Sequence, residues 1–337
     1  MHIDINQFLT LRHDLPVVDV RSEGEYEHGH VPGARNIPIL NNEERHQVGI
    51  DYKEKGQQEA IKTGFKMVGP RLSQIIEEAQ PLGTEFIVHC WRGGMRSANF
   101  CQFVQMANQK THQVVGGYKA YRHIVLDSFE QPLNLTVLGG CTGSGKTDVL
   151  HALATKGEQI IDLESLAHHK GSVFGGLMMP PQPSTEQFQN DLFEALLKLD
   201  RSRRIWIEDE SLRIGKICLP ESFWRQMNKS PIIEIVVNKE ERIKRLVREY
   251  GHTDSDAFLE AMTKITRKLG GQHFNTAKER MLQGDMASAI EILLGYYDKA
   301  YRIGLDNKAS RVKFKASWDG ENENPLCKEL LYYKEQN

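Results

Sequence analysis

A lone cysteine lies between an apolar run and a glycine-arginine segment in the first half of the chain. The stretch IVHCWRGGMRSANF places Cys90, Arg92 and Arg96 within seven residues. Its glycines allow successive backbone N–H groups to turn toward one point, which makes an anion site where a helix follows. Such a site favours the thiolate, the reactive form of cysteine, and the guanidinium groups can hold a tetrahedral oxyanion. We interpret Cys90 as a nucleophile rather than a buried thiol that ends a strand.

A second glycine-rich turn, GCTGSGKT, occupies 140–147 and has the Walker A spacing. It follows a predicted strand and opens a predicted helix, which is the context that this pattern requires. Its N–H groups are expected to wrap a diphosphate, while the lysine neutralises charge and the threonine can hold Mg²⁺. The residues predicted to bind the diphosphate are Gly140, Gly143, Ser144, Gly145, Lys146 and Thr147. The pattern does not distinguish ATP from another diphosphate.

Acidic residues follow two strands that are predicted to lie beside this turn. Glu208 and Asp209 end the stretch IWIEDE, where the Mg²⁺-binding acid of a P-loop protein would lie. A solvated strand end is the alternative interpretation. Asp162 and Glu164 end the neighbouring strand and are weaker candidates for the same ion or for a ligand hydroxyl.

Strands alternate with helices along most of the chain, which predicts parallel α/β sheets that place both turns at strand ends. The apolar runs at 15–20 and 85–90 belong to a first domain, predicted to span 1–130. The pattern restarts with the P-loop α/β domain, 131–254. From 255 to 337 the periodicity predicts a helical extension packed on that domain, ending in a basic, less regular tail.

Composition limits the classes of protein to which the chain can belong. The 337 residues have a net charge of −2, so binding of nucleic acid requires a local basic face, for which 201–204 and 308–315 are candidates. Five cysteines without a CxxC pair argue against a disulfide framework and a zinc site, so no structural metal is expected. There is no secretory h-region and no run of 18 apolar residues. We therefore expect a cytoplasmic protein that does not bind membranes.

The first 130 residues resemble the rhodanese family. VDVRSEGEYEHGHVPGARNIP is similar to that family's opening motif, and HCWRGGMRS is similar to its active loop. The resemblance implies that the loop cysteine carries a chalcogen as a persulfide. Five residues separate Cys90 from Arg96 instead of the usual four, which resembles the dual-specificity phosphatases of this fold and suits a donor containing phosphate. Two chemistries follow: phosphate ester hydrolysis, or chalcogen uptake from a phosphate-bearing donor.

The whole chain resembles the bacterial tRNA 2-selenouridine synthases. Besides the two turns, the similar stretches are 162–176, 207–215 and 293–301. The resemblance implies that the sulfur of a wobble 2-thiouridine in tRNA is replaced by selenium, through an S-geranyl intermediate. Selenophosphate and geranyl diphosphate are then the co-substrates, with Mg²⁺ as an optional cofactor, and tRNA and a selenophosphate-supplying enzyme are the partners.

The same resemblance assigns roles to individual residues. Cys90 would accept selenium while Arg92 and Arg96 hold the phosphate, and the P-loop would hold the diphosphate of the prenyl donor. Gly64, in GQQEAIKTG, is expected to lie near the active loop. Residues 172–180 could line a prenyl pocket or simply pack in the core.

Three alternatives compete with this function. The chain could join a sulfurtransferase to an ATP-dependent kinase or ATPase. It could be a cysteine-dependent phosphatase of the rhodanese fold, which needs a general acid near the loop. It could also be a non-catalytic sensor whose cysteine reports redox state.

Overall fold

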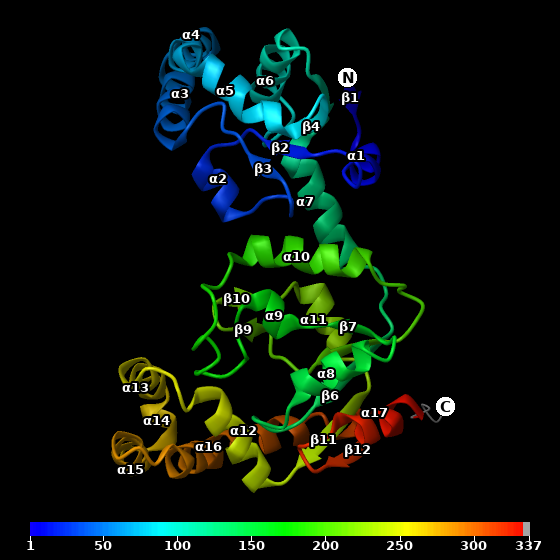
Figure 1. Cartoon of the computed structure of the whole chain (residues 1–337), viewed down its shortest axis with the longest axis vertical. Helices are drawn as coiled ribbons and strands as arrows, with labels where there is room; N and C mark the ends of the chain where they lie inside the picture. The colour runs from blue at the N-terminus through cyan, green and yellow to red at the C-terminus, as the bar shows by residue number, and fades with distance from the viewer. Residues whose placement is uncertain (333–337) are drawn as a thin grey trace. The chain divides into compact units, whose positions relative to one another are not determined.

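The computed structural model describes residues 1–332 and divides the chain into two compact units (Figure 1). The first unit contains Met1–Ser128 with Gln189–Asp191, and the second contains Phe129–Phe188 and the chain from Leu192 onward. The division falls two residues before the boundary expected from the sequence. The helical segment from 255 onward, expected to pack on the P-loop domain, is grouped in the same unit as that domain.

The first unit is built on a five-stranded, fully parallel sheet with the strand order β1-β5-β4-β2-β3. Its strands are β1 (His2–Ile3), β2 (Val17–Asp19), β3 (Arg35–Asn36), β4 (Glu85–His89) and β5 (Lys110–Val114). Its helices are α1 (Ile5–Leu11), α2 (Glu23–His28), α3 (Asn42–Glu54), α4 (Gln57–Val68), α5 (Leu72–Ala79), α6 (Met95–Met106) and α7 (Gly117–Ser128). Strand β4 is central and buried on both faces, as an apolar run in a parallel sheet requires.

One apolar core joins the sheet of the first unit to helices α4, α5 and α6. It includes Val88 and Phe86 of β4 together with Phe100, Cys101 and Val104 of α6. Cys101 was expected in the core, and it is buried there. The core fixes α6 against the carboxyl end of β4, which is where the cysteine loop lies.

The second unit also has a five-stranded parallel sheet, in the order β12-β11-β6-β8-β7. Its strands are β6 (Leu135–Gly139), β7 (Gln159–Ile161), β8 (Ile205–Glu208), β11 (Ile232–Val237) and β12 (Val312–Trp318), and β9 (Arg213–Ile214) and β10 (Ile217–Cys218) form a separate hairpin. Its helices are α8 (Lys146–Ala154), α9 (Leu163–Ala167), α10 (Thr185–Leu197), α11 (Glu221–Met227), α12 (Lys239–Tyr250), α13 (Ser255–Thr263), α14 (Thr266–Leu269), α15 (Gly271–Leu282), α16 (Met286–Asp306) and α17 (Glu323–Tyr332). Chain connections diverge on either side of β6, so ligands are expected at its carboxyl end.

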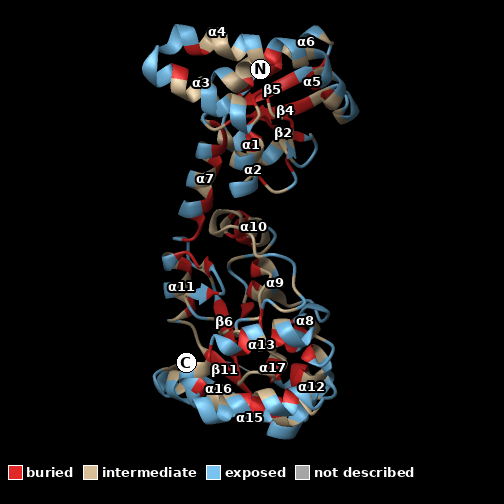
Figure 2. Ribbon diagram, turned by 90° about the vertical axis from the view of Figure 1, so that its left-hand side faces the viewer, coloured by how far each residue is buried: buried red, intermediate tan, exposed pale blue. Residues whose placement is uncertain are grey.

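Two apolar cores stabilise the second unit. One joins the sheet to α8 and α17, and the other joins α12, α13, α15 and α16 to Phe174 of a preceding loop. Figure 2 shows the buried residues gathered on the strands and inner helix faces of each unit. Within residues 1–332, no helix combines the length and apolarity needed to cross a bilayer.

Strand β12 was not predicted, because its alternating basic residues looked like an irregular tail. Ala316 and Trp318 are buried, and β12 pairs in parallel with β11. Lys308 and Arg311 of the basic stretch 308–315 make contacts within the protein. Lys308 pairs with Asp209, and Arg311 donates hydrogen bonds to the carbonyl oxygens of Met227 and Ser230. Lys313 and Lys315 remain exposed, so the interpretation of this stretch as an RNA-binding patch stays a prediction.

The C-terminal helix α17 contributes to the core of the second unit. Leu330 is fully buried, so Leu330→Ala should lower the free energy of unfolding of the second unit by about 2–5 kcal/mol. Urea denaturation followed by tryptophan fluorescence measures the change. Tyr332→Ala, at a position 83% exposed, is the matched control. Equal denaturation midpoints for the two variants would contradict this assignment.

Candidate functional site

Cys90 lies directly after β4, where the chain turns into α6. Its side chain is buried, and its Sγ is 3.2 Å from the hydroxyl oxygen of Ser97. Helix α6 begins at Met95. The thiol and the helix N-terminus are thus separated only by the turn Trp91–Gly94, the arrangement expected of an anion-binding loop.

The loop is held in place by a second glycine turn. A Cβ on Gly117 would lie 2.3 Å from the carbonyl oxygen of Cys90, and a Cβ on Gly93 would lie 2.3 Å from that of Val114. Both glycines have positive φ angles, so no side chain fits either by space or by conformation. The N–H of Tyr118 donates to the Cys90 carbonyl at 2.9 Å. The start of α7 therefore fixes the backbone that positions the thiol.

Ser97 gives the thiol a partner that can change its role. Its hydroxyl donates to the carbonyl oxygen of Gly94 at 3.0 Å and accepts from the side-chain amide of Gln113 at 2.9 Å. A hydroxyl has one proton, so the Cys90 thiol must be the donor while that bond to Gly94 lasts. Once the thiol ionises, the hydroxyl can rotate and donate to Sγ instead. Ser97 can therefore stabilise the thiolate.

Arg96 is paired with a carboxylate that the sequence did not reveal. Its Nη1 donates to Glu25 at 2.5 Å, and burial of Glu25 is outweighed by this hydrogen bond and charge, so the pKa of the carboxyl is lowered. Arg92 lies on the exposed side of the loop. An oxyanion at the loop can recruit Arg92 directly, whereas it must displace Glu25 to reach Arg96.

A buried ion pair stabilises the residues that position the loop. Asp19 and Arg21 are both inaccessible to solvent, and their closest charged atoms are 2.6 Å apart. The guanidinium of Arg21 also lies 3.9 Å from the centroid of the Tyr118 ring, and it donates to the carbonyl oxygen of Gly29 at 2.7 Å. The motif VDVR thus has a structural role, because it braces the residue that bonds to the Cys90 carbonyl.

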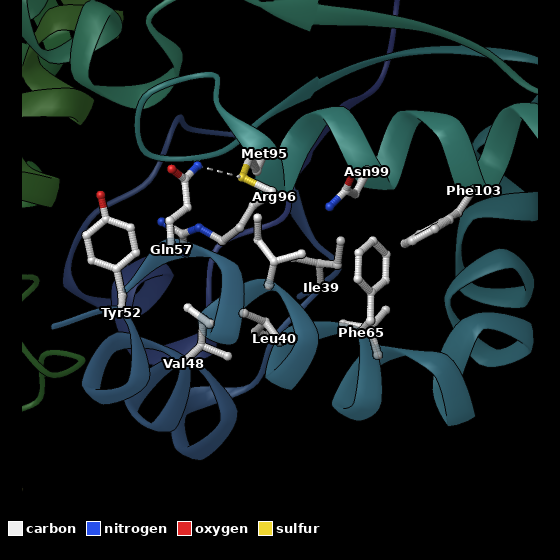
Figure 3. Close-up of a pocket in the computed structure, with 14 residues that line it drawn as sticks. Ile39, Leu40, Val48, Tyr52, Gln57, Phe65, Met95, Arg96, Asn99 and Phe103 are labelled. Carbon is white, nitrogen blue, oxygen red and sulfur yellow. Dashed lines mark hydrogen bonds between the residues drawn. The ribbon is translucent and has the colours of Figure 1, made fainter. Parts of the chain in front are cut away.

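An apolar pocket of about 160 Å³ opens beside the loop (Figure 3). Met95 and Arg96 line it from α6, and Gly64 lines it from α4. Its apolar wall consists of Ile39, Leu40, Val48, Tyr52, Ala60, Ile61, Phe65, Val68 and Phe103. A Cβ on Gly64 would approach nothing closer than Val48 at 4.0 Å. Gly64 therefore leaves space open in a pocket that the active loop shares.

The P-loop of the second unit connects β6 to α8. Lys146 folds back and donates to the carbonyl oxygen of Gly140 at 3.0 Å. Gly143 and Gly145 have positive φ angles, and a Cβ on either would come within 3.0 Å of α12, through Leu246 and Arg245. Ser144 is buried, and its hydroxyl has no hydrogen-bond partner within the described part of the chain. These contacts hold the loop in shape, with the Ser144 hydroxyl buried.

A cavity of about 720 Å³ surrounds this loop and is lined by opposing charges. The basic residues in its wall are Lys146, Lys170, Arg245, Arg248 and Lys308, and the acidic residues are Asp148, Glu164, Asp209, Glu210 and Glu249. A volume of this size accommodates a small diphosphate ester. The predicted diphosphate residues lie together at this cavity, except Ser144, which is buried behind it.

The two predicted acids have different environments. Asp209 lines the cavity, where both of its carboxylate oxygens accept from Lys308, at 2.7 and 2.9 Å. Glu208 is fully buried and accepts from the N–H of Leu163 at 3.2 Å. Burial, followed by the charges of Asp162 and Glu164, raises the pKa of Glu208 well above the ordinary carboxyl range. Glu208 therefore does not face a ligand.

A second carboxyl pair takes the position expected for those acids. Glu164 accepts from the Thr147 hydroxyl at 3.0 Å, and its other contact is a hydrogen bond with Glu210. Burial, followed by the negative charge of Glu164, raises the pKa of Glu210 to about 8. The two carboxyls therefore share a proton at neutral pH, held by Glu210. Two carboxyl oxygens and a threonine hydroxyl thus lie beside the P-loop.

Sequence reasoning missed residues that act at a distance. Glu25, Gln113, Arg245 and Lys308 approach the two turns from elsewhere in the chain, and nothing in their spacing signals this. Ser97 and Glu210 were detectable, because each is adjacent to a predicted residue. Within residues 1–332, no group of three or more His, Cys, Asp or Glu side chains is arranged to hold a metal ion.

The fold and the two sites define a protein in which a rhodanese-like domain precedes a P-loop domain. The family model "Rhodanese-like domain" matches residues 4–123, and the family model "tRNA 2-selenouridine synthase AAA domain" matches residues 133–324. The chain belongs to the tRNA 2-selenouridine synthase family.

Relatives with that name align along nearly the full length. The protein from Marinobacter nauticus is 36% identical and the alignment covers 92% of this chain and 94% of the relative. The protein from Shewanella halifaxensis is 33% identical, with 90% and 92% covered. The protein from Nitrosomonas europaea is 32% identical, also with 90% and 92% covered.

The proton on Glu210 predicts how stability depends on pH. Between about pH 4.5 and about pH 8 the folded chain holds a proton that the unfolded chain releases, so stability falls as pH rises through this window. Glu210→Gln removes that loss. Its melting temperature relative to the native protein should therefore rise between about pH 5 and pH 8.5. Calorimetry measures the difference in melting temperature, and Glu221→Gln, at an exposed position, is the control. A difference in melting temperature that does not vary with pH would contradict the shared proton.

Proposed function

We propose that this protein replaces the sulfur of 2-thiouridine at the wobble position of tRNA with selenium, through an S-geranyl intermediate. The observation that supports this most strongly is the joint presence of a thiol loop and a P-loop cavity in a chain similar to tRNA 2-selenouridine synthases along its full length. A selenophosphate-supplying enzyme would provide the selenium donor.

The first step in this proposal activates the sulfur as a leaving group. Sulfur at C2 of a thiouracil departs poorly, because it would leave as a sulfide-like anion. Alkylation at sulfur breaks the allylic C–O bond of geranyl diphosphate and releases diphosphate, after which the sulfur can leave as a thiol. The P-loop of the second unit would bind the diphosphate as its charge develops, with Lys146 exchanging the Gly140 carbonyl for a phosphate oxygen.

The residues at this site are compatible with Mg²⁺. The ion prefers oxygen ligands and commonly retains water and phosphate ligands. Thr147 and Glu164 offer a hydroxyl and a carboxylate beside the P-loop, and Glu210 can contribute once its proton is displaced. Bound there, Mg²⁺ would neutralise charge on the departing diphosphate.

The second step would take place at Cys90, and electron counting restricts it. Selenium in selenophosphate is already at the selenide level, so a sulfur–selenium bond on Cys90 would need an oxidant. Attack of Sγ on phosphorus needs none: the S–P bond forms, the P–Se bond breaks, and hydrogen selenide anion is released beside the phosphocysteine. That anion attacks C2 and displaces the geranylthiol, and water then hydrolyses the phosphocysteine. The wide loop, Arg92 and Ser97 suit this route, which replaces the selenium-carrying cysteine inferred from the resemblance.

The pocket beside the loop supports a prenylated substrate. Its wall is almost wholly apolar, it reaches the active loop at Met95, and Gly64 keeps it open. A hydrocarbon chain leaving as a thiol would be stabilised there by removal from water. The stretch 172–180, the other candidate prenyl wall, is divided: Phe174 is in the core, Met178 is 74% exposed, and Met179 and Pro180 line a separate cavity of the second unit.

Binding measurements separate the alternatives. A sulfurtransferase joined to a kinase or ATPase should bind ATP far more tightly than geranyl diphosphate, and the proposed enzyme should show the reverse preference. A phosphatase should hydrolyse an aryl phosphate at Cys90. A redox sensor should leave tRNA nucleosides unchanged when Cys90 is replaced.

The cysteine has a direct test in cells. Cys90→Ser should remove 2-selenouridine from tRNA and leave S-geranyl-2-thiouridine in its place, since only the second step needs the thiol. Nucleoside mass spectrometry of a deletion strain that expresses each variant measures both products. Cys101→Ser, in the core of the same unit, is the control. Wild-type levels of 2-selenouridine with Cys90→Ser would contradict the role of the thiol.

The P-loop lysine has the complementary test. Lys146→Ala removes a charge-assisted contact, so the affinity for geranyl diphosphate should fall about 10- to 100-fold. Calorimetric titration measures it, with Lys198→Ala, exposed on the same unit, as the control. Selenation of RNA that already carries S-geranyl-2-thiouridine should continue. Unchanged affinity would contradict assignment of the diphosphate to this loop.

A further inference from the structure

A second large cavity, of about 680 Å³, lies next to the P-loop cavity in the second unit. Gly171 and Ser172 line both cavities, so a short backbone segment separates them. The other lining residues come from 168–169, from parts of the segment 173–182, from the turn at 215–216 and from α13 with Lys264. None of them has a role in the chemistry described above.

Two of the stretches that resemble the family converge on this cavity. Residues 162–176 supply its histidines and the shared backbone, and residues 207–215 end at Gly215 in its wall. The two stretches also line the P-loop cavity, but only through Glu164, the segment 170–172 and residues 209–211. The remaining parts of both stretches form a surface of their own.

Hydrogen bonds hold the wall of the cavity in a fixed shape. The amide of Gln182 donates to the carbonyl oxygens of Ala167 and Ile214, at 2.9 and 3.0 Å, and its oxygen accepts from the N–H of Lys216 at 2.8 Å. One side chain therefore ties the 167–182 segment to the β9–β10 hairpin. A site that is preformed in this way loses little entropy on binding a ligand.

His169 is wedged between two glycines in this wall. A Cβ on Gly175 or on Gly215 would come within 2.9 Å of the imidazole ring. The Nδ1 atom is buried, with no hydrogen-bond partner in the part of the chain that the structure describes. Burial, and then the charge of Lys264, lowers the pKa of the ring, so it is neutral at physiological pH. A neutral imidazole has one donor and one acceptor nitrogen, so Nε2 can bond to a polar ligand while Nδ1 stays buried.

The rest of the lining combines flat apolar surface with positive charge. Met179, Pro180 and Pro181 provide the apolar part, and the exposed side chains of Lys216 and Lys264 provide the charge. Glu260 also lines the cavity, but its 3.6 Å contact with Lys264 is largely exposed, so an anionic ligand can replace it. A planar polar group linked to an anion matches this combination.

We propose that this cavity binds one uridine nucleotide of an RNA strand. The base lies against the apolar wall beside His169, and its backbone phosphates contact Lys216 and Lys264. The inference rests on the proposed function and deepens it, because the thiocarbonyl edge of the base would face Gly171 and Ser172, at the border of the diphosphate cavity. The prenyl donor would then occupy the P-loop cavity and the base would occupy the second cavity, on opposite sides of the segment Gly171–Ser172.

Binding of RNA tests the charged part of the proposal. The probe is a fluorescent anticodon stem-loop with 2-thiouridine at the wobble position, titrated with full-length protein and read by anisotropy. Lys216→Ala/Lys264→Ala should weaken binding about tenfold or more and reduce the slope of log affinity against log salt by about 1.4, which is two single-strand phosphate contacts. Lys198→Ala/Lys229→Ala removes the same charge from exposed positions outside the cavity and should change neither.

A change at Gly176 tests the cavity itself. A Cβ there would lie 3.5 Å from the His169 ring, an ordinary contact, so Gly176→Ala should bind normally while Gly176→Phe fills the space and weakens RNA binding. Geranyl diphosphate should bind both variants equally. The inference is overturned if Gly176→Phe binds RNA normally, if it loses only the prenyl donor, or if both double-lysine variants behave alike. The native protein failing to bind the RNA would instead reject the proposed function.

Discussion

The contact on which the first site depends is the packing of one glycine turn directly on another. With no Cβ at Gly93 or Gly117, the start of α7 approaches close enough to bond to the carbonyl oxygens of Cys90 and Trp91. These two bonds fix the backbone of the loop that is proposed to receive the anion. The P-loop is built in a similar way, because its glycines pack closely on α12. The opposite side of the loop faces the cavity proposed for the diphosphate.

Both sites hold their charges in exchangeable contacts. Arg96 is paired with Glu25, Lys308 with Asp209, and Lys146 with a carbonyl oxygen of its own loop. Each contact satisfies the cation in the absence of ligand, which avoids an uncompensated charge in a partly enclosed site, and under the proposed function a phosphate would replace the partner. The proton shared by Glu164 and Glu210 has a comparable effect, because it reduces the repulsion between the two carboxylates. A divalent cation bound there could replace the proton in this role.

The sequence predicted what is local and missed what is assembled from distant parts of the chain. Both glycine-rich turns follow a buried strand and open a helix within ten residues, so the spacing alone predicted that Cys90 and Lys146 lie in strand-to-helix loops. Glu25 lies 71 residues from Arg96, and no periodicity links them. Strand β12 was missed because its exposed lysines masked an alternation that only pairing with β11 makes meaningful. Pairing with β11 also explains why the basic stretch at 312–315 forms a strand instead of an irregular tail.

The covalent state of Cys90 during the first turnover tests the central claim most directly. The purified protein is mixed with selenophosphate and an S-geranyl-2-thiouridine RNA, quenched in acid-free conditions that preserve phosphocysteine, and analysed by peptide mass spectrometry. The account predicts a transient phosphoryl group on the Cys90 peptide and on no other cysteine, appearing before 2-selenouridine. Selenium on Cys90, or a thiol that stays unmodified while selenation proceeds, would contradict it.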